Sequence, residues 1–292
     1  MNTETTVLAC IALPLLAPAL ITALHRWPNP RETVTLLTST CLFLLVYSLL
    51  DEVLQGMRPT LDLVEPLPGL KISFEVEPLG MLFALLASFL WVVTSVYSIG
   101  YMRSHHESRQ TSYYSYFAVA LGSVMGIAFA GNLLTLFIFY ELLTLSTYPL
   151  VTHAGDNAAR NAGRMYLGYL LGTSVMMLSL ALIWTWALTG TLDFRTGGIL
   201  EGAVTPGMSG ILLILFIFGI GKAAIIPFHL WLPAAMVAPT PVSALLHAVA
   251  VVKAGVFTVL KVVIYIFGVD FLAEIPATQW LMYVAAATIL IA

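Results

Sequence analysis

Long apolar runs separated by short polar segments dominate this sequence. Eight runs of membrane-spanning length cover residues 5–25, 32–54, 79–101, 112–130, 133–151, 163–188, 209–235 and 241–268. About 20 apolar residues in helical conformation cross the roughly 30 Å hydrocarbon core of a bilayer. The runs are too long and too uniformly apolar to be the alternating strands of a membrane barrel, so the pattern predicts an all-α bundle of transmembrane helices.

A ninth apolar run is shorter than the others. It begins near Gln279 and continues to Ala292. At about 1.5 Å per residue, a helix over this run would measure about 21 Å, which is less than the bilayer core. The pattern therefore predicts that more helices follow, either in a longer polypeptide or in a neighbouring chain.

The polar segment at residues 55–78 has a different periodicity. It contains the stretch KISFEVE, in which apolar and polar residues alternate as they do in a strand. We expect this segment to form a hairpin over one end of the helical bundle.

The composition agrees with a lipid environment. Apolar residues make up 60% of the chain and charged residues only 9%, whereas about a quarter of the residues of a soluble domain are charged. The chain has no basic run that could follow phosphates, so nucleic acid is not an expected partner. It also has no CxxC cluster or dinucleotide-binding glycine loop, so we expect neither a cofactor nor a metal.

Arginine and lysine are distributed unevenly between alternate loops. The loops after the first, third and fifth runs hold Arg26, Arg31, Arg103, Arg109, Arg160 and Arg164, and the opposite loops hold Arg58, Lys71 and Arg195. Loops rich in these residues stay in the cytoplasm. The pattern predicts a multi-pass protein of the cell membrane with its N-terminus on the outer face.

Four residues of fixed charge lie inside the apolar runs: Glu141, Lys222, Lys253 and Lys261. A charge near the bilayer centre costs a few kcal/mol even on lenient scales, so such residues usually carry function. Glu141, Lys222 and Lys253 have comparable predicted depths, which is the pattern of a proton relay. Lys261 lies near the end of its run, where its stem could reach the interface.

The seventh run also contains a predicted helix break. Pro227 follows Lys222 closely, removes a backbone donor and places its ring against the preceding turn. Interrupted helices beside a charged residue recur at the translocation sites of transporters. His229 and His247 flank this region, and histidine can transfer protons near neutral pH. His153, by contrast, is expected in a solvated loop.

Structural roles are the alternative for each of these residues. Glu141 could be a neutral, hydrogen-bonded acid, and Lys222 and Lys253 could be partners in buried ion pairs. Lys261 could be an interface anchor and His229 a packed member of an aromatic belt.

The run around the break resembles a known family. The stretch GKAAIIPFHLWLPAAMVAPTPVSALLHAVAVVKAGVF is similar to the core of the antiporter-like subunits of respiratory complex I, Mrp cation antiporters and membrane-bound hydrogenases. FYELLTLSTYPL and ISFEVEPLGMLF fit the same family. The stretch HAVAVVKAGVF is more similar to the Mrp and complex I subunit 5 branch than to the hydrogenase branch.

The resemblance implies a fold and a set of site residues. The family contains two inverted repeats, helices 4–8 and 9–13, each with a broken helix. We expect residues 1–111 to form three N-terminal helices, residues 112–268 the first repeat, and residues 269–292 the start of a further helix. By resemblance, Glu141 and Lys222 match the glutamate and lysine of the relay. His247 and Lys253 match its eighth-helix positions, and Lys261 stands where an arginine is common.

Together these observations predict a proton-translocating subunit of a multi-subunit respiratory or Mrp-type complex. Its expected partners are other membrane subunits, hydrophilic redox subunits, lipid, protons and, in an antiporter, sodium. It would then belong to a translocase without carrying redox chemistry itself. Three alternatives stay open: a gradient-driven Mrp antiporter subunit, the membrane module of a bicarbonate-uptake complex, and a non-conducting scaffold.

Overall fold

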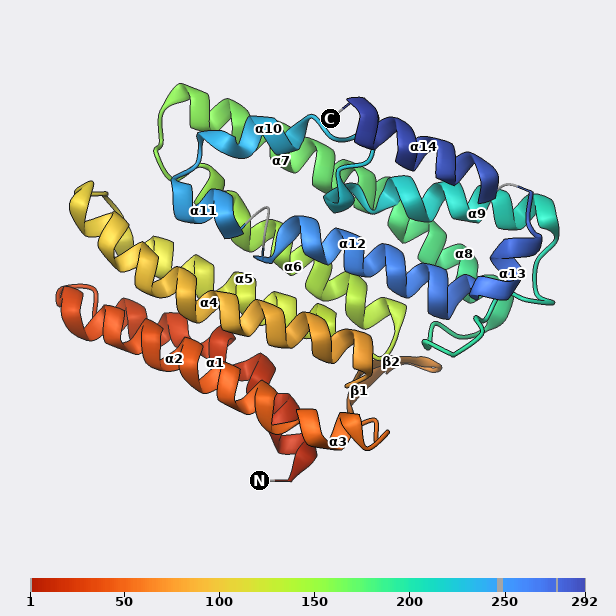
Figure 1. Ribbon diagram of the computed structural model, residues 1–292, viewed down its shortest axis with the longest axis horizontal. Helices are drawn as coiled ribbons and strands as arrows, with labels where there is room; N and C mark the ends of the chain where they lie inside the picture. Colours follow the sequence, from red (N-terminus) through yellow and green to blue (C-terminus); the bar gives the residue numbers. More distant parts are fainter. Residues whose placement is uncertain (1, 246–248, 277, 292) are drawn as a thin grey trace.

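The computed structural model describes residues 2–245, 249–276 and 278–291, and it forms a bundle of long helices with a β-hairpin at one end (Figure 1). The first half contains α1 (Thr3–Ala23), α2 (Pro28–Ser48), α3 (Leu50–Leu54), α4 (Pro78–Ser104), α5 (Gln110–Ala128) and α6 (Leu133–Val151). The second half contains α7 (Asn157–Thr173), α8 (Ser179–Thr189), α9 (Pro206–Gly219), α10 (Trp231–Ala234), α11 (Thr240–Ala244), α12 (Val251–Lys261), α13 (Val269–Glu274) and α14 (Thr278–Ile291). Two π-helical turns, Ser174–Leu178 and Val262–Phe267, follow α7 and α12.

The predicted all-α membrane bundle is confirmed. Within the described residues, five helices are long and apolar enough to cross a membrane: Thr3–Ala23, Pro28–Leu54, Pro78–Ser104, Leu133–Val151 and Asn157–Thr189. Each overlaps a predicted run. The structure differs most from the prediction in the seventh and eighth runs, which are divided among shorter helices.

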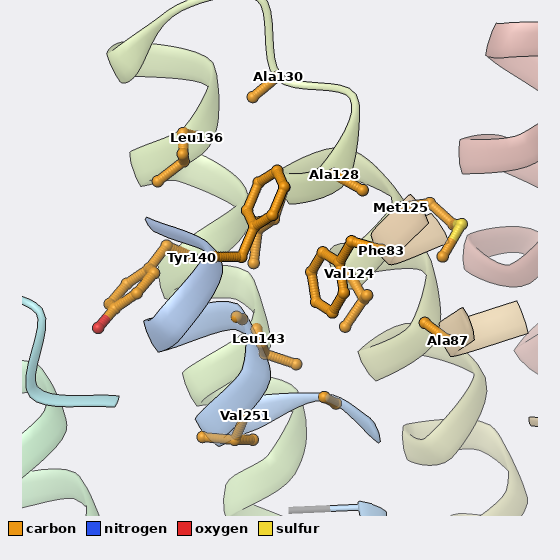
Figure 2. Close-up of a cluster of buried hydrophobic side chains, with 14 of the residues drawn as sticks. Phe83, Ala87, Val124, Met125, Ala128, Ala130, Leu136, Tyr140, Leu143 and Val251 are labelled. Carbon is orange, nitrogen blue, oxygen red and sulfur yellow. The ribbon is translucent and has the colours of Figure 1, made fainter. Parts of the chain in front are cut away.

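Helix α5 occupies the centre of the first half. Residues 120–130 are all buried, as expected for a helix that is apolar on every side. Gly122 and Gly126 allow close packing, since a Cβ there would collide with Leu15 of α1 and with the ring of Phe139 of α6. Figure 2 shows the core at which α4, α5, α6 and α12 meet, with Phe83, Ala87, Val124, Met125, Ala128, Leu136, Tyr140, Leu143 and Val251 labelled.

Large apolar side chains cover the outer surface of the bundle. Leu16, Leu20 and Leu82 are 68%, 60% and 66% exposed. Exposure of this kind would disfavour folding in water, but lipid tails are as apolar as leucine. The surface therefore matches the predicted lipid environment.

The predicted hairpin is present. Strands β1 (Thr60–Leu67) and β2 (Leu70–Glu75) are antiparallel, with Thr60 opposite Glu75. Asn132, the residue before α6, donates from Nδ2 to the Lys71 carbonyl over 2.8 Å, and the Ser73 amide donates to Thr135 Oγ1 over 3.0 Å. These bonds attach the hairpin to the start of α6.

The loops alternate between the two ends of the bundle as predicted. The hairpin, α3 and α13 lie at one end, and the connections α1–α2, α4–α5 and α6–α7 lie at the other (Figure 1). The arginine-rich connections therefore share one end.

Candidate functional site

The site is built around an interruption that begins earlier than predicted. Helix α9 ends at Gly219, Ile220 has a non-helical ψ of 58°, and Ala224 adopts left-handed backbone geometry with φ 53°. Pro227 lies exposed in the non-helical segment that follows. The predicted break is present, but the chain leaves the helix at Ile220, before Pro227, which lies within the non-helical segment.

Two glycines explain why the chain leaves the helix at this point. Glycine is among the weakest helix formers, and a Cβ on Gly219 or Gly221 would collide with Leu178 or Thr173 respectively. Both contacts lie at the π-helical turn after α7 or immediately before it. The interruption after α9 therefore packs against the π-helical turn after α7. Such turns within helices often occur at functional sites.

Lys222 lies fully buried in this interruption, at 0% exposure. Its Nζ donates to the Tyr140 carbonyl oxygen over 2.9 Å and to the hydroxyl of Thr144, both on α6. The ammonium also lies 3.3 Å from the centroid of the Tyr140 ring. All three interactions are with neutral groups, and Lys222 forms no ion pair among the described residues.

Side chains from other helices satisfy the backbone groups freed by the break. The Lys222 amide donates to the Tyr140 hydroxyl over 3.1 Å, and Trp231 Nε1 donates to the Gly221 carbonyl over 3.0 Å. Gly255 of α12 lies against the Lys222–Ala223 backbone, where a Cβ would collide. Irregular backbone at membrane depth requires such partners.

Glu141 follows Tyr140 on α6 and lies close enough to Lys222 to interact with it electrostatically. The two do not form a direct ion pair, and both Glu141 carboxylate oxygens are buried without a hydrogen-bond partner among the described residues. Buried polar groups without partners are rare and usually indicate strain, a functional role or bound water. Glu141 and Lys222 therefore lie within electrostatic range of each other without an ion pair.

The histidines and Lys253 contribute less to this cluster. His229 is half-buried after the interruption, and its Nδ1 has no partner in the described part of the chain. Lys253 is exposed on α12 and lies outside the Lys222 cluster in the described part of the chain. Hydropathy gives the depth of a residue along a helix but not the face on which it lies. His247 falls outside the described residues.

Lys261 has a different environment from the predicted interface. It is 1% exposed and forms an ion pair with Glu77, which is 2% exposed and immediately precedes α4. Its Nζ lies 4.2 Å from the centroid of the Phe194 ring. The interpretation of Lys261 as an anchor that reaches the interface is therefore wrong.

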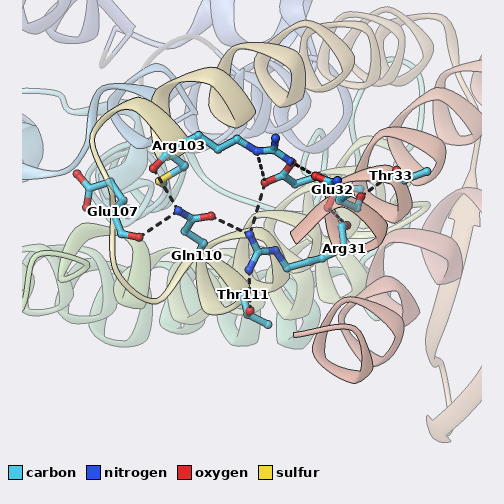
Figure 3. Close-up of polar contacts among 10 residues, drawn as sticks. Arg31, Glu32, Thr33, Arg103, Glu107, Gln110 and Thr111 are labelled. Atoms are coloured by element: carbon cyan, nitrogen blue, oxygen red, sulfur yellow. Dashed lines mark hydrogen bonds and ion pairs between the residues drawn. The ribbon is translucent and has the colours of Figure 1, made fainter. Parts of the chain in front are cut away.

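The opposite end of the bundle holds a second charged network (Figure 3). Glu32 of α2 pairs with Arg103 of α4, and Arg31 donates to Gln110 over 2.7 Å. Arg31 lies within α2 and is 5% exposed, so its assignment to the loop after the first run was wrong. His153, also interpreted as a solvated loop residue, is 4% exposed, and burial lowers its pKa.

Sequence reasoning missed the uncharged members of the site. Tyr140 and Thr144 hold Lys222, and Thr147 lies 2.5 Å from the Tyr166 hydroxyl. One signal was available, because Tyr140, Thr144 and Thr147 recur at spacings of four and three on α6 and so share a face. Glu77 was visible only as the last residue of the strand-like KISFEVE.

These features define a class of protein. A helical membrane bundle that surrounds a buried lysine at a discontinuous helix has the architecture of ion transporters. Residues 130–292, more than half of the chain, match the family described as NADH:quinone oxidoreductase/Mrp antiporter, transmembrane. The chain belongs to this family.

Curated relatives come from both branches of the family. A Na(+)/H(+) antiporter subunit of Alkalihalophilus pseudofirmus is 35% identical over 202 residues, which are 66% of this chain and 24% of that protein. NAD(P)H-quinone oxidoreductase chain 5 of Synechocystis sp. is 33% identical over 202 residues, which are 66% of this chain and 29% of that protein. The chain thus spans about a quarter of the length of these relatives.

Solved structures support the fold. The membrane-bound sulfane sulfur reductase, an archaeal respiratory membrane complex, contains a chain with a TM-score of 0.80 and 20% identity, and the match covers 97% of this chain and 56% of that one. The Mrp complex from Dietzia sp. gives a TM-score of 0.75 and 22% identity, with 96% and 29% covered. The resemblance to this family is therefore confirmed in sequence and in fold.

Proposed function

We propose that this chain is part of a proton-translocating membrane subunit in a multi-subunit respiratory or Mrp-type complex. Glu141, Lys222, His247 and Lys253 form the proposed relay, with His229 and Lys261 as further pathway residues. Residues 112–268 would be the first of two repeats, after three helices in residues 1–111. Residues 269–292 would begin the next segment.

The buried ammonium of Lys222 is the observation that carries this proposal. A permanently charged structural lysine would be expected to pair with a carboxylate, because an uncompensated buried charge is expensive. Lys222 instead contacts a carbonyl, a hydroxyl and an aromatic ring. Such a site can hold the ammonium or the neutral amine, as a proton relay requires.

Glu141 supplies the adjustable charge in the proposed relay. Its electrostatic influence reaches Lys222, but no hydrogen bond fixes its carboxylate among the described residues. A small movement of Glu141 toward or away from Lys222 would change how strongly Lys222 holds its proton.

Lys253 would connect this segment to the rest of the pathway. It is exposed on α12, and an exposed ammonium in hydrocarbon needs a polar partner or a water-filled cavity. We infer that helices outside this chain supply that partner. Other membrane subunits, and redox subunits in a respiratory complex, are the proposed partners.

The proposed location is the cell membrane, with the N-terminus and the hairpin end outside. The arginine-rich connections gather at the opposite end of the bundle (Figure 1), and the distribution of positive charge favours that end for the cytoplasm.

Proton movement in membrane vesicles that contain the native complex would test the proposal. We expect Lys222→Ala to abolish the acidification signal while the complex stays assembled on a native gel. Arg160→Ala, which removes an exposed cation at the start of α7, is the control and should keep the wild-type rate. Wild-type rates with Lys222→Ala would contradict the relay.

The same vesicles would distinguish the two branches of the family. An imposed sodium gradient should drive proton movement if the complex is an antiporter. A redox-driven pump should respond to an electron donor instead and stay silent under the sodium gradient.

A further inference from the structure

A polar cavity of about 290 Å³ lies at the hairpin end, away from Lys222. Its wall is formed by β1, β2 and the loop after α8, and it includes the charged residues Asp62, Lys71, Glu75, Asp193 and Arg195. Asp62 is already paired with Lys71, and Glu75 with Arg58. Neither Asp193 nor Arg195 has an ion pair in the described part of the chain, so the lining carries three carboxylates against two cations.

Phe194 separates this cavity from the buried pair of Glu77 and Lys261. Phe194 lines the cavity, and its ring centroid lies 4.2 Å from Lys261 Nζ. Beyond the ring, Lys261 pairs with Glu77, and both side chains are almost fully buried. One aromatic side chain thus lies between a polar cavity and a buried ion pair.

The segment that carries Phe194 is attached directly to the end of α12. The Ile199 amide donates to the Ile266 carbonyl over 2.9 Å, and Gly198 lies against the Phe267 backbone with a φ of +92°. Ile266 and Phe267 belong to the π-helical turn that begins one residue after Lys261. A change in this turn would therefore move Phe194 and Lys261 together.

We propose that this cavity is an aqueous vestibule for small cations, closed toward the membrane interior by Phe194 and the Glu77–Lys261 pair. Breaking the pair or displacing the ring would open a hydrated route from the vestibule along α12. Thr258, one turn before Lys261 on the same face of α12 and 0% exposed, lies at the start of that route. The inference rests on the proposed translocation function, because it assigns one mouth of the pathway.

Thiol accessibility tests the vestibule without measuring transport. In a background of Cys10→Ala and Cys41→Ala, a single Thr258→Cys leaves the ion pair intact, and Lys261→Cys serves as a second reporter. The intact complex would be treated with a membrane-impermeant, cationic thiol reagent from each side of the membrane. Labelling is expected only from the hairpin side. It should be slow at Thr258→Cys, where the Glu77–Lys261 pair is intact, and faster at Lys261→Cys, where the pair is broken.

Adding Phe194→Ala to the Thr258→Cys variant removes the ring. This change should accelerate labelling of Thr258→Cys several-fold. Phe271→Ala removes a half-buried ring from α13, outside the cavity lining, and should leave the rate unchanged. Three outcomes would overturn the proposal. They are equal labelling rates with and without Phe194→Ala, labelling from the opposite side, and no labelling of either reporter. Repeating the measurement with Lys222→Ala separates vestibule access from translocation, because labelling requires water access alone.

Discussion

Two buried lysines in this chain solve the same electrostatic problem differently. Lys222 and Lys261 are 0% and 1% exposed. Lys261 is neutralised by Glu77, whereas Lys222 is held by neutral groups of Tyr140 and Thr144. The difference separates a charge that is fixed by a direct ion pair from one that neutral groups hold and that Glu141 influences only from a distance.

The largest expected effect concerns the site with neutral ligands. Lys222→Met should abolish measurable proton translocation, as Lys222→Ala is expected to do, and thermal stability should change little. Within the described residues, this variant breaks no direct ion pair. Vesicle acidification and a thermal melt of the purified complex measure the two quantities. A large loss of stability would show that Lys222 is structural, like Lys261.

Glu141→Gln should reduce translocation about as much as loss of Lys222. If the two residues act as one unit, the double variant Glu141→Gln/Lys222→Met should be little worse than either single variant, because such effects are not additive. Rates of the three variants in the same vesicles decide the matter. Losses that multiply independently would place the two residues on separate paths.

The fixed pair should respond in stability. Glu77→Gln leaves the Lys261 ammonium buried without a counter-charge, which is expected to cost about 3–5 kcal/mol. Adding Lys261→Met should recover much of that loss, since both charges are then absent. Denaturant unfolding would measure these differences, with the exposed Glu201→Gln as a control expected to change stability by less than about 0.5 kcal/mol. A single variant as stable as the control would show that the pair is not effectively buried.

The smallest effect concerns the backbone beside Lys222. Trp231→Phe keeps the aromatic packing but removes the donor to the Gly221 carbonyl, and it should cost about 1–3 kcal/mol because that carbonyl loses its partner. Trp280→Phe is the matched control, since Trp280 Nε1 has no partner within the described residues. Unfolding of the two variants under identical conditions checks the difference. Equal costs would argue against a role for the bond.

The helices of the first half could be predicted from the sequence because hydropathy is a local property. The α6 bounds, Leu133–Val151, coincide with the fifth predicted run. The orientation of side chains could not be predicted in this way. Lys253 and Lys222 have similar predicted depths, yet one is exposed and the other buried, because the face of a helix that meets its neighbours depends on tertiary packing.

The partner of Lys261 could not be predicted from the sequence either, because the contact also depends on tertiary packing. Glu77 lies 184 positions away along the chain, and nothing local distinguishes it from the loop acids nearby. The helix break shows a subtler limit. Proline chemistry located the interruption in the right segment, but the two glycines around Ile220, fixed by contacts with the turn after α7, set where α9 ends.

The hairpin tip offers a means of determining which side of the membrane each end of the bundle faces. Pro68 and Gly69 are exposed at the turn between β1 and β2, and Gly69, with φ +81°, has open space around its Cβ position. A short epitope inserted between these residues would project from the bundle without entering its core. Antibody binding to intact cells, but not to sealed inside-out vesicles, would place the hairpin on the outer surface. The turn is thus a natural attachment point for labels, antibody fragments and imaging fiducials on a protein that otherwise presents little besides lipid-facing surface.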